Sequence, residues 1–94
     1  MNIYRIWQDV NCDYDTYDSA IVVAENEEAA RKIHPRGLNA TGYNEYTHLY
    51  DLPWWKGTDT DRTWCQIDNV NVELVGTTNL YKEEKILLAS FNAG

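Results

Sequence analysis

The stretch AIVVAENEEAARKIHP, residues 20–35, decides the fold. Its first residues are apolar and rich in β-branched side chains, and the run is too short for an amphipathic helix, so the sequence predicts a strand over residues 17–25. A continuous apolar run is typical of a strand that is covered on both faces, which predicts a central position in a sheet.

The second half of this stretch predicts a helix over residues 27–34. Asn26 is a favourable N-cap, two glutamates follow in the first turn, His34 joins two basic residues in the last turn, and Pro35 is a stop signal. The apolar stripe is narrow, which predicts a helix that lies against a sheet with most of its surface in water.

Further strands are predicted on both sides of this unit, over residues 3–8, 63–67, 70–75 and 86–91. Residues 76–84 are expected to form a hairpin loop between the last two strands, and residues 36–61 predict a long aromatic-rich loop without a sustained period. This order predicts an α+β fold, a single small domain over residues 1–94 with one helix after the second strand and a mainly antiparallel sheet of four to five strands.

Length and composition favour one folded domain. The chain has 94 residues, of which 44% are hydrophobic and 24% are charged, a balance typical of globular proteins. No apolar run is long enough to span a membrane and the N-terminus lacks the features of a signal peptide, so a cytoplasmic protein without a membrane partner is expected. The two cysteines, Cys12 and Cys65, are expected to be free thiols in a reducing compartment.

The net charge indicates what kind of partner the surface attracts. The formal charge is −7 and the isoelectric point is about 4.6, so the surface repels phosphate backbones and direct binding of nucleic acid is not expected. The same field attracts a protein with a basic surface.

The acidic stretch DVNCDYDTYD, residues 9–18, begins like a calcium loop, since Asp9, Asn11, Asp13 and Asp15 occupy alternate positions. An EF-hand loop also needs a glycine at its sixth position and a bidentate glutamate at its twelfth, where this chain has Tyr14 and Ala20. The stretch is therefore interpreted as an acidic connection between two strands, with no metal.

No catalytic or cofactor-binding motif is present. Cys and His residues lack the close spacing of a zinc site, and the chain has neither a G-x-S-x-G nucleophile motif nor a glycine-rich phosphate loop. We therefore expect no catalytic residues, no cofactor and no enzymatic activity.

Aromatic residues are dense in one stretch of the chain. Four Trp, seven Tyr and one Phe make up 13% of the residues, and about half of them fall within or next to residues 43–64. They are expected to pin the loop onto the sheet, or to form an anchor patch for a partner or a stacked base. The candidate partner-binding residues are Asp9, Asp13, Asp15, Asp18, Tyr46, Tyr50, Trp54 and Trp55, and an alternative ligand-binding set is Arg36, Tyr43, Arg62 and Trp64.

Parts of the chain resemble a known group of proteins. The opening IYRIWQDVNCDYDTYDSAIVVAENEEAARKIHP, with TWC, VNVELVG and the closing LLASFNAG, resembles small uncharacterised proteins encoded by phages and prophages. The resemblance covers both ends of the chain, leaves residues 36–61 unmatched, and transfers no catalytic motif. It implies a counter-defence role.

Two functions of different classes follow from these observations. The first is an inhibitor that binds a bacterial defence protein with a basic surface through acidic and aromatic residues, as anti-CRISPR proteins do. The second is a sponge that sequesters a small nucleotide signal, with aromatic rings on the base and Arg36 or Arg62 on phosphate. A phage accessory protein without a defence role is a further alternative, and self-association into a homo-oligomer is left open.

Overall fold

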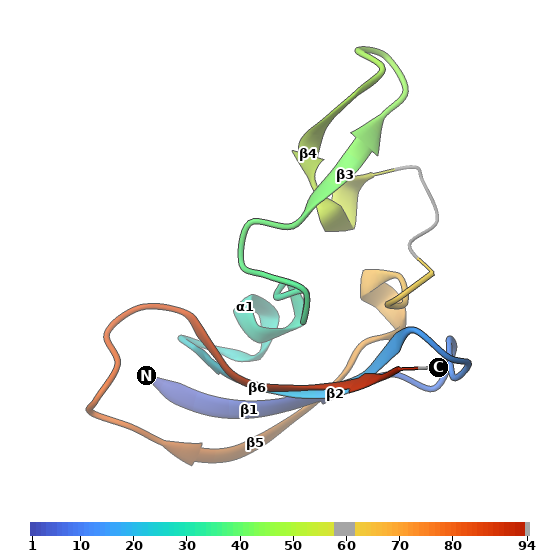
Figure 1. Ribbon diagram of the computed structural model, residues 1–94. Helices are drawn as coiled ribbons and strands as arrows, with labels where there is room; N and C mark the ends of the chain where they lie inside the picture. Colours follow the sequence, from blue (N-terminus) through green and yellow to red (C-terminus); the bar gives the residue numbers. More distant parts are fainter. Residues whose placement is uncertain (58–61, 94) are drawn as a thin grey trace.

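The computed structural model describes residues 1–57 and 62–93 and shows a small α+β domain (Figure 1). This confirms the predicted fold class. The elements in chain order are β1 (Asn2–Trp7), β2 (Thr16–Ala24), α1 (Glu27–Arg31), β3 (Thr41–Asn44), β4 (Leu49–Pro53), the 3-10 turns η1 (Trp54–Lys56) and η2 (Ile67–Asn69), β5 (Asn71–Thr77) and β6 (Lys85–Asn92). None of the helices in the described ranges is long and apolar enough to cross a membrane.

Four strands form one antiparallel sheet in the order β5-β1-β2-β6, and β3 and β4 form a separate hairpin. The central position predicted for residues 17–25 is confirmed, because β2 pairs with β1 on one side and β6 on the other. The expectation that β2 is covered on both faces is met only in part. The consecutive residues Val22, Val23 and Ala24 are all fully buried, so both faces are shielded at that end of the strand. The covering elements α1, η2 and the hairpin, however, all lie on the same side of the sheet (Figure 1).

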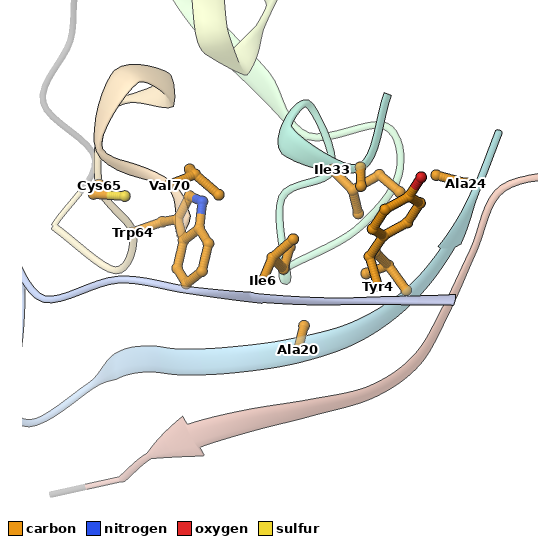
Figure 2. Close-up of a cluster of buried hydrophobic side chains, with 10 residues drawn as sticks. Tyr4, Ile6, Ala20, Ala24, Ile33, Trp64, Cys65 and Val70 are labelled. Atoms are coloured by element: carbon orange, nitrogen blue, oxygen red, sulfur yellow. The ribbon is translucent and has the colours of Figure 1, made fainter. Parts of the chain in front are cut away.

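The core lies between the sheet and these covering elements (Figure 2). Alternate side chains of β1 and β2 point into it, as the pleat requires. The largest side chain of the core is Trp64, which lies in the segment before η2 and is 1% exposed. The buried cluster consists of Tyr4, Ile6, Ala20, Val22, Ala24, Ala30, Ile33, Trp64, Cys65 and Val70.

Helix α1 begins as predicted but ends early. The Ala29 amide donates to the Asn26 side chain over 2.8 Å, which confirms the N-cap. The helix ends at Arg31 rather than at residue 34, because the amides of Lys32 and Ile33 each donate three residues back, to Ala29 and Ala30. Bonds of this kind tighten and close a last turn, and they direct Ile33 and His34 into the interior.

The segment 36–61 was predicted to be a long loop, but its described part, residues 36–57, contains regular structure. They contain the β3–β4 hairpin and η1, and the remaining part, 58–61, lies outside the described residues. The short hairpin strands contain glycine and proline and lack clean alternation, which conceals them in the sequence.

Two further predictions, one for a strand and one for a hairpin loop, are also wrong. Residues 63–67 form no strand, although Trp64 and Cys65 are buried, because β-forming residues reflect burial as much as backbone conformation. Residues 76–84 are not a hairpin loop, because β5 pairs with β1 and β6 pairs with β2, at opposite edges of the sheet. The alternation of apolar and polar side chains specifies which face of a strand is buried, but not the neighbouring strand with which it pairs.

Candidate functional site

The connection between β1 and β2 carries the acidic residues and is held at several points. The Gln8 side chain donates to the carbonyls of Tyr17, over 2.8 Å, and Thr63, over 3.2 Å, and the Asn11 side chain donates to the Trp64 carbonyl over 2.7 Å. Asp15 has a left-handed backbone with φ 61°, a conformation that Asp tolerates better than most residues. The candidate residues of this connection, Asp9, Asp13, Asp15 and Asp18, are all exposed.

This connection does not have the geometry of a metal site. Asn11 uses its amide group on the Trp64 backbone, and the Asp13 carbonyl accepts from the Thr16 hydroxyl and the Asn92 side chain. Within residues 1–57 and 62–93, no three His, Cys, Asp or Glu side chains come together in a way that would hold a metal ion.

The β3–β4 hairpin projects from the body of the molecule (Figure 1). Its turn is fixed by local bonds: the Tyr46 amide donates to the Asn44 side chain over 2.9 Å, and the His48 amide donates to the Asn44 carbonyl over 2.8 Å. The Thr47 hydroxyl donates to the Asp51 carboxylate, and His48 has a left-handed backbone with φ 59°. An Asn side chain that bonds its own turn is a common turn signal, and Asn44 is the residue from which this hairpin could have been predicted.

The hairpin exposes large apolar and aromatic side chains. Tyr46 at its tip is 88% exposed, and Leu49 and Tyr50 on β4 are 60% and 61% exposed. On the same hairpin the Tyr43 and Tyr50 rings meet edge to face at 5.3 Å, and the Tyr43 hydroxyl lies 3.0 Å from His48 Nδ1. Tyr46 and Tyr50 were predicted to bind a partner, whereas Leu49 was missed.

Trp54 and Trp55, at the base of the hairpin, have different surroundings. The Trp54 indole donates to the Lys32 carbonyl over 2.7 Å and packs against the core, so it ties the hairpin to the body. The Trp55 ring has the ammonium groups of Lys32 and Lys56 at 4.5 Å and 5.0 Å from its centroid, a cation–π arrangement.

His34 lies at the centre of an aromatic cluster that the sequence did not predict. Its side chain is fully buried, and the ring centroids of Trp54, Tyr17 and Trp64 lie at 5.3, 6.2 and 6.2 Å from its own. The Arg36 amide donates to its Nδ1 over 3.0 Å. His34 therefore does not close the helix as expected; it joins β2, η1 and the segment before η2.

A cleft of about 400 Å³ lies between the acidic connection, η1 and η2. Val10 and Asn11 of the acidic connection and Trp54 and Trp55 of η1 line it, so two of the candidate partner-binding residues border the cleft. The four candidate aspartates and the two candidate tyrosines are not in its lining. Trp64 also lines it, and its buried indole N–H has no hydrogen-bond partner among the described residues. Asp68 of η2 brings a carboxylate to this cleft, a residue that the sequence did not single out.

The alternative ligand-binding residues do not share this cleft. Of Arg36, Tyr43, Arg62 and Trp64, only Trp64 is in its lining. Both arginines are exposed, Tyr43 belongs to the hairpin and Trp64 is buried in the core.

Both cysteines are free, as predicted. Cys12 is exposed in the acidic connection, and Cys65 is 3% exposed. Burial raises the pKa of the Cys65 thiol to about 11, so this thiol is protonated and unreactive at neutral pH.

The candidate site thus consists of the acidic connection, the hairpin, and the cleft that lies between the acidic connection, η1 and η2. The comparison of this chain with protein-family models, with curated proteins and with solved structures gives no match.

Proposed function

We propose that this protein is a non-enzymatic inhibitor that binds a bacterial defence protein through the β3–β4 hairpin and the acidic connection. The observation that carries the proposal is the exposure of Tyr46, Leu49 and Tyr50 on a projecting hairpin. Exposed aromatic and aliphatic side chains grouped on one element are typical of interaction sites, and tyrosine is enriched at binding hot spots.

The rigidity of the hairpin supports this role. The bonds of Asn44, Thr47 and His48 hold the turn in one conformation before a partner binds. Less conformational freedom is then lost on binding, which strengthens affinity without additional contacts.

The distribution of charge favours a basic partner. From residue 6 to residue 30 the chain contains seven acidic residues and no Lys or Arg. Such a surface accelerates encounter with a positively charged protein, for instance one that handles nucleic acid, and repels the nucleic acid itself. Action in the cytoplasm of a bacterial host follows from the resemblance to phage proteins.

A nucleotide sponge is the second candidate, and one observation favours it. Lys32 and Lys56 lie over the Trp55 ring beside the cleft, so two ammonium groups and an indole are close together, as recognition of a phosphate and a base requires. The Lys32 ammonium also pairs with the Glu28 carboxylate at 4.0 Å. The acidic surroundings oppose an anionic ligand, which places this function second.

The two functions are separated by recovering what the tagged protein binds. The wild type, Tyr46→Ala and a control, Leu80→Ala, are each incubated with lysate of a bacterium that carries an active CRISPR system, and bound proteins and metabolites are identified. Leu80 is 84% exposed in the connection between β5 and β6, so its truncation leaves the hairpin unchanged.

We expect the wild type and Leu80→Ala to retain a defence protein and to restore plating of a targeted phage. Tyr46→Ala should lose at least about tenfold in affinity for that protein, because truncation of an aromatic hot spot typically costs ~2 kcal/mol or more. Recovery of a nucleotide by all three proteins, with no defence protein, would replace the inhibitor with the sponge.

A further inference from the structure

The face of the four-stranded sheet opposite the core has no described element packed on it (Figure 1). Side chains alternate along a strand, so Ile3, Arg5 and Trp7 of β1 point to this open face while Tyr4 and Ile6 point into the core. The strand registers add to this face the side chains of Ser19, Ile21, Val23, Asn71, Glu73, Lys85, Leu88 and Ser90.

This open face is mainly apolar at its centre. Val23 is fully buried, and Ile21 and Trp7 are half-buried. Leu88 remains 66% exposed. The Arg5 guanidinium lies 4.4 Å from the centroid of the Trp7 ring. Tryptophan and arginine are the residues most enriched at binding hot spots.

The open face is large enough for a specific interface. With strands of six to nine residues, a rise of about 3.3 Å per residue and a strand spacing of about 4.8 Å, the face measures roughly 25 Å by 19 Å. Two such faces in contact bury on the order of 1,000 Å², the lower limit expected of a biological interface.

The charges of the open face favour a second copy of the chain over the basic partner proposed above. Arg5 lies directly opposite Glu73 on the neighbouring strand. In the described part of the chain neither side chain takes part in an ion pair. A basic protein would meet Arg5 and Lys85 here with one carboxylate to offset them, whereas a second copy offers Glu73 to Arg5 and Arg5 to Glu73.

We propose that two copies of this chain form a symmetric dimer through the open face. Two apolar sheet faces pack about 10 Å apart with their strands inclined by roughly 30°. In a two-fold dimer the same patch is used by both copies, so Arg5 of each copy pairs with Glu73 of the other. Both hairpins then point outward, and the dimer presents two docking arms to a partner.

The first test is sedimentation equilibrium of the full chain over a dilution series from nanomolar to high micromolar concentration. We expect the wild type to dissociate reversibly from dimer to monomer on dilution. Leu88→Glu should weaken dimerisation at least about tenfold, because it places a charge in an apolar interface. The matched control, Leu80→Glu, introduces the same change at an exposed leucine outside the sheet and should dimerise like the wild type.

The second test exchanges the charges of Arg5 and Glu73. Arg5→Glu and Glu73→Arg should each dimerise poorly alone, because each places like charges opposite one another. A mixture of the two variants should form a heterodimer, since every acidic side chain then faces a basic one. Circular dichroism melts verify that each variant is folded.

Three results would overturn the dimer: a wild type that is monomeric throughout the series, equal dimerisation of Leu88→Glu and Leu80→Glu, or no heterodimer in the mixture. The measurement needs no defence protein, so its outcome is independent of the inhibitor proposal.

Discussion

At the scale of the residue, Trp54 and Trp55 are neighbours that perform different tasks. Trp54→Ala removes a partly buried indole hydrogen bond and a ring contact with His34, and should lower the free energy of unfolding by about 2 kcal/mol or more. Trp55→Ala removes cation–π contacts at a half-exposed position and should cost about 1 kcal/mol or less. Urea unfolding followed by circular dichroism measures both.

The same pair separates a packing role from a binding role. Trp55→Ala leaves the fold intact, so any loss of partner binding in this variant assigns Trp55 to the interface. If Trp55→Ala destabilises the protein as much as Trp54→Ala, both residues pack the base of the hairpin and neither is an independent anchor.

At the scale of the element, the base of the hairpin depends on two glycines in contact. A Cβ added to Gly42 of β3 would lie 2.7 Å from the Gly57 Cα, which is too close for any side chain. Gly42→Ala should therefore force the hairpin away from η1 and lower the free energy of unfolding by about 1–3 kcal/mol, the usual cost of overpacking.

Gly37→Ala is the control for this prediction, because a Cβ there would meet no atom within 4 Å. Urea unfolding compares the two variants, and hydrogen exchange of the β3 and β4 amides reports whether the hairpin has loosened. Equal stabilities for Gly42→Ala and Gly37→Ala would show that the contact between Gly42 and Gly57 does not hold the hairpin.

At the scale of the whole molecule, two exposed surfaces differ in charge. The acidic connection carries four exposed aspartates, while the open face of the sheet combines apolar side chains with Arg5, Lys85 and Glu73. Such a division allows one surface to steer a partner electrostatically while the other holds two copies together.

Steering by the acidic connection is tested with Asp13→Lys combined with Asp18→Lys. This change should slow association with the defence protein and weaken its dependence on salt, while the dissociation rate changes less. Asp15 is left unchanged because its left-handed backbone suits Asp. Stopped-flow binding at low and high salt measures these rates.

Glu83→Lys combined with Glu84→Lys is the matched control, since it alters the net charge equally at exposed positions between β5 and β6. Equal slowing by both double variants would mean that net charge alone, and not the acidic connection, governs encounter.

The sequence by itself determined the features that depend on neighbours along the chain. The apolar run before Glu25 predicts β2, and Asn26 followed by two glutamates predicts the start of α1, because a cap bonds an amide three residues away. The acidic connection also follows from local composition. The sequence leaves open whether Tyr46 and Tyr50 pack on the sheet or face solvent, and their exposure is found only in the structure.

Only the tertiary structure decided the features that depend on distant residues. The pairing of β5 with β1 and of β6 with β2 is selected by long-range packing, which alternation along one strand does not specify. The burial of His34 has the same cause, because Trp54 and Trp64, distant in sequence, build its surroundings. The cleft and the open face exist only because every covering element packs on one side of the sheet, an arrangement set by the total surface removed from water rather than by any local segment.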